Sequence, residues 1–214
     1  MSDSAARLRA GAAAFGLTLS DAQLAQFAQL VSELLKWNKA YNLTAITEPE
    51  AILTHHLLDS LAVQPDLSGV RIADVGTGAG FPGLPLAIVE PTRQFTLIDS
   101  ADKKLRFVDH AARALGLTNV RSWHGRAEQY TGEPFDTVIA RAFAPLPRLL
   151  ALVAPMVGPA TRVVAMKGRW PSAGGGQDGG ALPAGWSIEM VRPVAVPGLD
   201  EARHQILLRR AGAQ

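Results

Sequence analysis

The fold is indicated by Ile72-Ala73-Asp74-Val75-Gly76-Thr77-Gly78-Ala79-Gly80-Phe81-Pro82-Gly83, in which a short β-rich run leads through alternate glycines into a helical pattern. Glycine suits such a turn because it adopts positive φ without steric cost and lets a ligand approach the backbone closely. Two nucleotide-binding motifs overlap here. Residues 78–83 have the G-x-G-x-x-G form of dinucleotide enzymes, and residues 74–80 have the acid-x-G-x-G-x-G form of S-adenosylmethionine (SAM) enzymes.

The charges of the two ligands distinguish these motifs. A pyrophosphate is anionic and is bound by free N–H groups at a helix N-terminus, whereas SAM carries a sulfonium and an ammonium, which a carboxylate attracts. Asp74 would repel a pyrophosphate, and the turn begins directly after Val75, which makes Gly76 its first glycine. The stretch therefore favours SAM, with a dinucleotide and a purely structural turn as the alternatives. Asp99, which ends the next β-rich run, suits ribose hydroxyls in either cofactor.

From residue 70 onward, β-rich runs alternate with helical patterns, which predicts a mostly parallel sheet covered by helices on both faces. The last two runs are joined without a helix, so we expect one of them to be antiparallel. A glycine-rich stretch at 172–185 predicts a mobile surface loop. The predicted strands are 70–75, 95–99, 120–123, 135–140, 161–166, 187–191 and 205–209, and the predicted helices among them include 103–115 and 146–157.

The first 66 residues predict a helical cap on a sheet domain of residues 67–214. Residues 20–23, Ser-Asp-Ala-Gln, have the form of a capping box, and apolar residues then recur at helical spacing as far as Asn42. Pro49 suits the first turn of a second helix. The aromatic residues that close the first helix could stack on RNA, but we favour packing of the cap against the sheet domain; these closing residues are Trp37, Tyr41 and Asn42.

The composition excludes several classes of protein. With 48% hydrophobic and 19% charged residues, the chain can bury a sizeable core and need not be disordered. It contains no cysteine, which excludes disulfides, a thiolate zinc site and a thiol nucleophile. The longest apolar stretch, 149–157, is far too short to span a membrane, and the N-terminus lacks the regions of a signal peptide. We expect a soluble, cytoplasmic protein.

Charge is distributed unevenly along the chain. Residues 1–66 carry four basic and seven acidic residues, a net charge of −3, whereas residues 67–214 carry seventeen basic and twelve acidic residues, a net charge of +5. A basic second part suits an acidic partner such as nucleic acid. A solvated surface with a small excess of arginine explains the same distribution equally well.

Residues and motifs that the sequence lacks reduce the number of possible methyl acceptors. Methylation at C5 of a pyrimidine commonly uses a cysteine, and exocyclic amine methylation commonly uses an Asp/Asn-Pro-Pro-aromatic loop after the fourth strand. Here that position reads Arg141-Ala142-Phe143-Ala144-Pro145. A lone-pair acceptor such as guanine N7 needs neither a covalent adduct nor a general base, so the sequence is consistent with it and we assign no catalytic side chain.

Several stretches together carry a family resemblance: 36–44, 56–60, 74–86, 95–100, 103–107, 125–128, 141–144 and 167–168. Over nearly its whole length the chain resembles the bacterial small-subunit ribosomal RNA guanine-N7 methyltransferases, the RsmG or GidB family. The stretches 36–44 and 74–86 are specific enough to name it, whereas a glycine loop alone is not. The glycine-rich residues 174–180 depart from the family in a region of variable length.

The resemblance implies an α/β, Rossmann-like SAM-dependent methyltransferase with a seven-stranded sheet. It implies a guanosine of 16S rRNA as acceptor, guanosine 527 in the 530 loop, with the RNA either free or in the small ribosomal subunit, and S-adenosyl-L-homocysteine as product. The SAM-binding residues that it implies are Gly76, Phe81, Asp99, Ser100, Ala101, Ala127, Glu128 and Arg141, to which the glycine motif adds Asp74, Gly78 and Gly80.

Four basic residues are candidates for RNA binding. Lys167 ends the fifth predicted strand, and we expect Arg126 and Arg203 near it, where they could hold phosphates or the guanine O6. Arg141 follows the fourth strand, at the edge where open α/β sheets bind ligands, and is expected to span cofactor and acceptor. Each residue also has a plain alternative, a surface cation for the first three and a salt bridge to a neighbouring carboxylate for Arg141.

The histidines show no metal-ligand spacing, so no metal is expected. His56 and Asp59 are spaced for a local structural hydrogen bond. We expect a monomer, and two other functions stay open: a methyltransferase of the same fold that acts on a small molecule, and a non-catalytic rRNA-binding or assembly factor.

Overall fold

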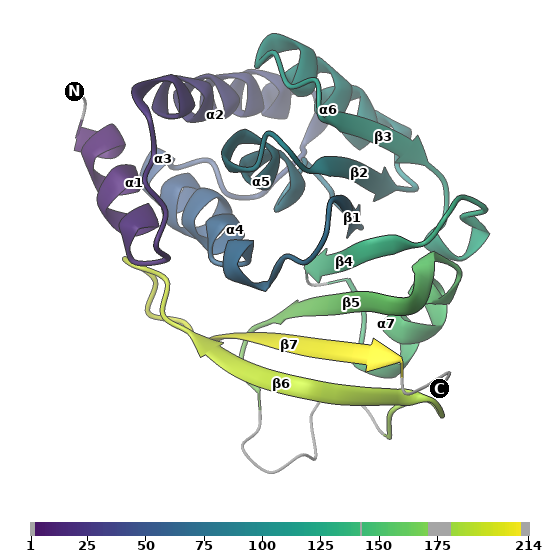
Figure 1. The fold of residues 1–214 in the computed structure, drawn as a ribbon. Coiled ribbons are helices and arrows are strands. Elements are labelled where there is room, and N and C mark those ends of the chain that lie inside the picture. The colour runs from purple at the N-terminus through teal and green to yellow at the C-terminus, as the bar shows by residue number, and fades with distance from the viewer. Residues whose placement is uncertain (1–2, 142, 171–180, 211–214) are drawn as a thin grey trace.

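The computed structural model describes residues 3–141, 143–170 and 181–210. A seven-stranded sheet runs through the molecule in the order β3-β2-β1-β4-β5-β7-β6 (Figure 1). The first five strands pair in parallel, and β7 pairs antiparallel with both β5 and β6, so the expected mostly parallel sheet, with one of the last two strands antiparallel, is confirmed. The strands are β1 (Arg71–Val75), β2 (Gln94–Asp99), β3 (Val120–His124), β4 (Phe135–Arg141), β5 (Val157–Lys167), β6 (Trp186–Val194) and β7 (Arg203–Arg210).

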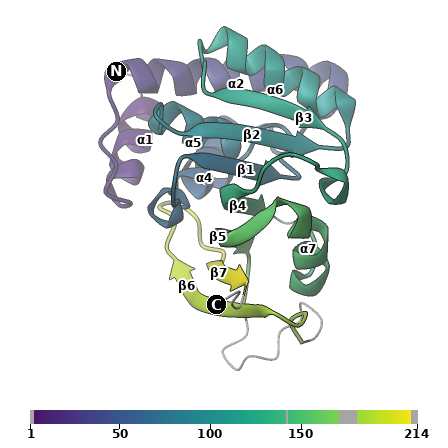
Figure 2. The same cartoon turned by 45° about the vertical axis from the view of Figure 1, so that its right-hand side comes forward.

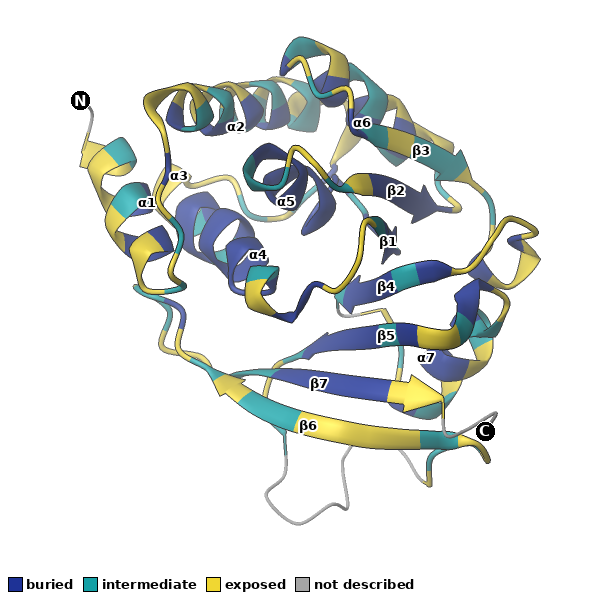
Figure 3. Cartoon of the chain, viewed as in Figure 1, coloured by how far each residue is buried: buried dark blue, intermediate teal, exposed yellow. Residues whose placement is uncertain are grey.

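Neighbouring residues of the central strands enter two apolar clusters, one on each face of the sheet. Ile72 of β1 belongs to the cluster that is covered by α5 (Gly83–Val89) and α6 (Asp102–Ala114). The next residue, Ala73, belongs to the second cluster, which is covered by α7 (Leu146–Val153). In Figure 2, α7 lies apart from the other helices, beside β4 and β5. Because both faces are covered, β1, β2 and β4 are almost wholly buried (Figure 3).

The N-terminal helices pack on the first of these faces and share its core. Apolar residues of α1 (Asp3–Ala13) and α2 (Asp21–Tyr41) lie in the same cluster as Ile72. The predicted capping box is present, since the Ser20 side chain accepts a hydrogen bond from the Gln23 N–H and the Gln23 side chain accepts one from the Ser20 N–H. Asn42, with φ of 49°, ends α2 as predicted. The cap and the sheet therefore bury one continuous apolar cluster.

The second predicted helix of the cap contains a π-helical turn. It consists of α3 (Pro49–Ile52), a π-helical turn at Leu53–Leu58 and α4 (Asp59–Leu61), followed by a 3₁₀ turn at Gln64–Asp66. Single π-helical turns are found frequently at functional sites. Three residues of this segment, His55, His56 and Asp59, line the cavity described below.

Some predicted boundaries differ from the structure. The helix predicted at 146–157 ends at Val153, and a 3₁₀ turn at Ala154–Met156 leads into β5. The cause is Pro155, which cannot donate the backbone hydrogen bond that would continue the helix. The helix α1 was not predicted at all. Residues 172–180 of the predicted glycine-rich loop lie outside the described residues. No helix within the described ranges is long and apolar enough to cross a membrane.

Candidate functional site

Two adjoining cavities open at the carboxyl ends of the parallel strands, where ligands bind in open α/β sheets. One, the cap cavity, has a volume of about 360 Å³ and lies between the π-helical segment, the glycine loop and the ends of β5 and β7. The other, the strand-end cavity, has a volume of about 400 Å³ and lies among the ends of β1, β2 and β4 and residues 125–128. Gly76 and Arg141 line both cavities, so the two spaces meet at these residues.

The glycine loop presents bare backbone at this junction. Gly76 and Gly78 have φ of 70° and 61°, in the left-handed region that favours glycine. A Cβ atom at Gly76 would lie 2.3 Å from the Phe143 ring, whereas one at Gly78 would meet only the carbonyl oxygen of Gly76, at 4.0 Å. Gly76 therefore allows close packing of Phe143, which follows β4, and Gly78 leaves open space beside its backbone.

Asp74 holds the glycine loop from beneath. Its side chain is fully buried at the end of β1, and its Oδ2 accepts hydrogen bonds from Thr77 Oγ1 at 2.6 Å and from the Gly83 N–H at 2.8 Å. Burial raises the pKa of Asp74 to about 6, although both hydrogen bonds act in the opposite direction. The buried Oδ1 has no hydrogen-bond partner among the described residues. Asp74 thus joins both ends of the loop, a structural role that the sequence analysis did not assign.

Asp99 connects the glycine loop to the end of β2. Its Oδ2 accepts a hydrogen bond from the Gly78 N–H at 3.0 Å, and its Oδ1 accepts one from the Ala101 N–H at 2.9 Å. Lys104 lies 3.7 Å from Oδ2. The carboxylate borders the strand-end cavity, so it can accept further hydrogen bonds there while it holds the loop in place.

The predicted cofactor residues are divided between the two cavities. Asp99, Ser100, Ala127 and Glu128 line the strand-end cavity, and Gly78 and Phe81 line the cap cavity. Asp74, Gly80 and Ala101 are not among the lining residues of either one, and each supports the loop or the β2 end through backbone or side-chain hydrogen bonds. Direct contact between these three residues and a cofactor stays a prediction.

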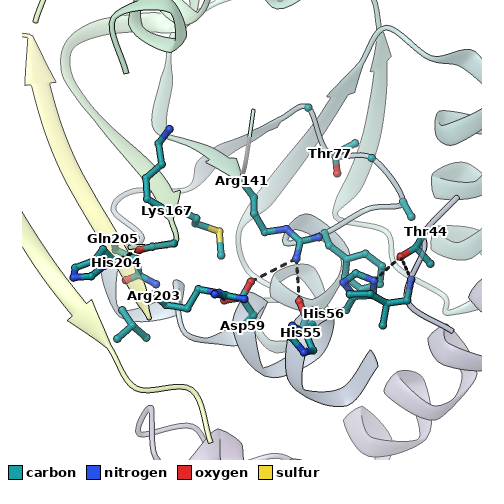
Figure 4. A pocket seen from close by; sticks show the side chains of 18 of the residues that line it. Thr44, His55, His56, Asp59, Thr77, Arg141, Lys167, Arg203, His204 and Gln205 are labelled. Carbon is teal, nitrogen blue, oxygen red and sulfur yellow. Dashed lines mark hydrogen bonds and ion pairs between the residues drawn. The ribbon is translucent and has the colours of Figure 1, made fainter. Parts of the chain in front are cut away.

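Two arginines meet at one buried carboxylate in the cap cavity (Figure 4). Arg141 Nη1 lies 3.5 Å from Asp59 Oδ2 and donates a hydrogen bond to the His55 carbonyl oxygen at 3.0 Å. Arg203 Nε lies 3.3 Å from Asp59 Oδ1. Arg141 therefore forms the salt bridge that was its plain alternative, and it also borders both cavities, while its contact with cofactor and acceptor stays a prediction. Burial raises the pKa of Asp59, and the two guanidinium groups oppose this rise.

The predicted hydrogen bond between His56 and Asp59 is wrong. The His56 ring stacks on Phe81 with 4.6 Å between ring centroids, and its Nε2 shares a hydrogen bond of 2.9 Å with Thr44 Oγ1. Burial and the nearby charge of Arg141 lower the pKa of His56 to about 4, so the imidazole is neutral at pH 7. A carboxylate pairs more strongly with two guanidinium groups than with a neutral imidazole, which explains why Asp59 faces the arginines.

The basic residues predicted to lie together are divided between the two cavities. Lys167 and Arg203 both line the cap cavity, because β5 and β7 pair with Lys167 opposite His204. Lys167 Nζ donates a hydrogen bond to the Ala144 carbonyl oxygen at 2.7 Å. Arg126 instead lines the strand-end cavity. It follows β3, which is separated from β5 by three strands, so the expectation that Arg126 lies near Lys167 is wrong.

The aromatic residues at the end of α2 mainly pack the cap onto α6. The Trp37 ring lies 5.8 Å from the Phe107 ring and 4.9 Å from the His110 ring, measured between centroids. Tyr41 stacks on Trp37 but is 41% exposed. The preference for packing is confirmed for Trp37. Among the residues that the structure describes, no group of three or more histidine or acidic side chains could hold a metal ion.

Comparisons with known proteins agree with this architecture. The family model described as rRNA small subunit methyltransferase G matches residues 23–206. The chain is 44% identical over 196 residues to the ribosomal RNA small subunit methyltransferase G of Erwinia tasmaniensis, covering 91% of this chain and 94% of that one. It is 45% identical over 208 residues to the protein of the same name from Azoarcus sp., covering 96% of each chain.

Solved structures share the fold at low sequence identity. A mutant of MtNAS, solved in complex with S-adenosylmethionine, superposes with a TM-score of 0.57 and 15% identity over 97% of this chain and 78% of that chain. TrmN from Thermus thermophilus superposes with a TM-score of 0.53 and 21% identity over 74% of this chain and 53% of that chain. These likenesses show the Rossmann-like methyltransferase fold.

Proposed function

The chain belongs to the rRNA small subunit methyltransferase G family, and from this premise we propose that it transfers a methyl group from SAM to N7 of a guanosine in 16S rRNA. The observation that carries the proposal is the pair of cavities that meet at Gly76 and Arg141. One, the strand-end cavity, has the carboxylates of Asp99 and Glu128, which suit the hydroxyl groups and the positive charge of SAM, and four basic side chains beside them, Lys104, Arg126, Arg141 and Arg148. The other has three cationic side chains, which suit a nucleotide within a polyanion.

Residues of the strand-end cavity and of the adjoining glycine loop fit SAM. Gly78 leaves open space beside the backbone, and Asp99 presents a carboxylate where ribose hydroxyls could donate hydrogen bonds. Asp74, beneath the loop, adds a further carboxylate, whose Oδ1 has no hydrogen-bond partner within the described part of the chain. When bound, SAM supplies an electrophilic methyl group on a sulfonium. We propose that it is held by the predicted set, which comprises Asp74, Gly76, Gly78, Gly80, Phe81, Asp99, Ser100, Ala101, Ala127, Glu128 and Arg141.

The cap cavity fits a purine nucleotide. Arg141, Lys167 and Arg203 supply positive charge, and Ile46 and Met166 supply apolar surface for the faces of a base. We propose that these cations bind the RNA around the target guanosine, and that Arg126 binds RNA at the neighbouring strand-end cavity. By family resemblance the target is guanosine 527 of the 530 loop.

N7 is favoured as the acceptor because it needs no proton removed. The two titratable side chains from the cap segment with shifted pKa are unsuited to act as a general base: Asp59 is paired with two arginines, and His56 has a pKa of about 4. The chain also has no cysteine to form a covalent adduct. We infer that catalysis rests on holding acceptor and methyl donor in the correct geometry and on excluding water. Correct orientation alone can lower an activation barrier by roughly 7 to 11 kcal/mol.

The test is methyl transfer from tritiated SAM to naked 16S rRNA, to assembled small subunits and to a small-metabolite pool, followed by nucleoside analysis of the labelled RNA. We expect label in the RNA as 7-methylguanosine. Label only in metabolites would identify a small-molecule methyltransferase, and no label despite SAM binding would identify a non-catalytic assembly factor. The comparison of naked RNA with assembled subunits also shows which of them is the substrate.

A matched pair of variants connects the activity to the cap cavity. Arg203→Gln removes a cavity charge from β7, and Arg209→Gln removes the same charge from the same strand at a residue that pairs with Glu189 away from both cavities. We expect the first to lower RNA methylation and the second to leave it near the wild-type rate. Equal losses in both variants would refute the assignment of the cap cavity to RNA.

The remaining expectations become proposals about the whole chain. We propose that it acts as a monomer in the cytoplasm without a metal, and that residues 1–66 form a helical cap on the methyltransferase domain of residues 67–214. Analytical ultracentrifugation tests the oligomeric state, and activity after exhaustive chelation tests the metal. Loss of activity on chelation that added divalent metal restores would contradict the proposal.

A further inference from the structure

Asp59 is the point at which three separate elements of the site are joined. The residue lies directly after the π-helical turn of the cap, and only 5% of its surface is exposed. One carboxylate oxygen faces Arg141 at the end of β4, at 3.5 Å, and the other faces Arg203 at the start of β7, at 3.3 Å. Figure 4 shows the carboxylate between the two guanidinium groups. A single side chain thus fixes two arginines that come from different strands.

The two arginines belong to different parts of the proposed reaction. Arg141 borders both cavities, and its guanidinium carbon lies 5.9 Å from the centre of the Phe81 ring, next to the glycine loop. Arg203 lines the cap cavity but not the strand-end cavity. A guanidinium group has five N–H donors, and Asp59 is approached by one nitrogen of each, so most of the donors are not used by this carboxylate. The pairing with Asp59 restrains both arginine side chains and leaves most of their N–H donors available for other acceptors.

The Arg141 and Arg203 side chains are partly exposed, so a restraint on them can order the site before a ligand binds. A partly exposed arginine samples many rotamers, and fixing it in one of them costs side-chain entropy. A buried carboxylate that satisfies part of each guanidinium supplies that order before the RNA binds, which is the general route by which preorganised sites gain catalytic rate.

We propose that Asp59 is a positioning residue for methyl transfer, which holds Arg141 and Arg203 at a fixed separation so that cofactor-side and acceptor-side contacts form together. This inference rests on the proposed function. It is distinct from a purely structural role, for which the chain offers a matched comparison. Asp66 is equally buried and pairs with Arg192 at 2.6 Å, but it does not line either cavity.

The first experiment measures side-chain order without any activity. Nitrogen-15 NMR of the full chain would record solvent exchange of the Arg203 Nε–H, assigned by its loss in Arg203→Lys, in the wild type, Asp59→Asn and Asp66→Asn. Because this N–H faces the Asp59 carboxylate, we expect its exchange to accelerate about tenfold or more in Asp59→Asn and to stay unchanged in Asp66→Asn. Equal exchange in the wild type and Asp59→Asn would overturn the inference.

The second experiment measures methylation kinetics of the same variants on the RNA substrate. Asp59→Asn keeps the size of the side chain and removes its charge. We expect kcat to fall about tenfold to hundredfold while the Kd values for SAM and for RNA change by less than about threefold, because binding contacts remain and their alignment is lost. We expect Asp66→Asn to keep the wild-type kcat. A fall in kcat that Asp66→Asn reproduces would mean that Asp59 is only structural.

A double-mutant cycle with Arg203→Gln provides the final check. If Asp59 acts through Arg203, the double variant should lose clearly less kcat than the product of the two single losses, because the second change removes a contact that is already disrupted. Losses that multiply would overturn the inference. If the wild type transfers no methyl group to RNA, the proposed function fails, and the NMR result still decides whether Asp59 orders the arginine.

Discussion

The neutral histidine in the cap should make the stability of the protein depend on pH. His56 is 6% exposed, and burial together with the charge of Arg141 lowers its pKa from 6.5 to about 4. Between pH 6.5 and pH 4 the unfolded chain binds a proton on this residue that the folded chain does not, so the free energy of unfolding falls as the pH falls through this window. A shift of this size corresponds to about 3 kcal/mol, at about 1.4 kcal/mol for each unit.

A second buried group changes stability in the opposite direction. Burial raises the pKa of Asp74 to about 6, so between pH 6 and pH 4 the folded chain binds a proton that the unfolded chain does not, and this contribution to stability grows as the pH falls. The pKa of Asp59 is raised as well, so the pH profile of the wild type alone would not isolate the contribution of His56. The informative quantity is the difference in unfolding free energy between the wild type and His56→Gln, in which the contribution of Asp74 cancels.

The assay is urea denaturation of both proteins at half-unit steps from pH 7.5 to pH 4. We expect the advantage of the wild type over His56→Gln to shrink by about 3 kcal/mol across this range. Thr44→Val is the control, because it removes the hydrogen bond to the His56 ring but keeps the imidazole, and should shift stability without removing the pH dependence. A difference between the wild type and His56→Gln that stays constant with pH would refute the reasoning.

Three further predictions concern the loop and the two cavities. Gly83→Ala would place a Cβ atom 2.7 Å from Leu97 and 2.8 Å from Asp74 Oδ2, so we expect a loss of about 1–3 kcal/mol in urea denaturation, and an unchanged midpoint would contradict it. Asp99→Asn should keep the fold and weaken SAM binding about tenfold, as measured by calorimetry. An unaltered affinity for SAM would disprove this prediction. Lys167→Gln should weaken RNA binding and reduce the slope of log Kd against log salt by about 1, and an equal slope in both proteins would count against an RNA contact.

Features set by residues close together in the sequence could be predicted. The capping box at Ser20 and the turn of the glycine loop each depend on positions within a few residues of one another, so pattern and spacing identify them. The strand-end location of Asp99 followed from the same alternation of strands and helices. Helix α1 was missed, and part of its stability comes from packing of residues such as Leu8 against the cap core, which a local sequence pattern does not reveal.

Features that depend on pairing between distant residues could not be predicted. Asp59 meets two arginines that follow it by 82 and 144 positions, and a local pattern carries no information about such contacts. Spacing alone therefore suggested a bond to His56, three residues away. The position of Arg126 failed for a similar reason, because the order of strands in the sheet, and not their order in the chain, decides which strand ends are neighbours.

The structure gives a further explanation for the uneven distribution of charge along the sequence. Acidic residues of the cap pair with basic residues of the sheet domain: Asp59 with Arg141 and Arg203, and Asp66 with Arg192. Part of the opposite charge of the two segments therefore serves to dock the cap. Arg192 is therefore less available to phosphates, whereas Arg141 and Arg203 keep N–H donors that Asp59 does not use. The cap also shapes the proposed RNA site, because His55, His56 and Asp59 line the cap cavity beside these two arginines.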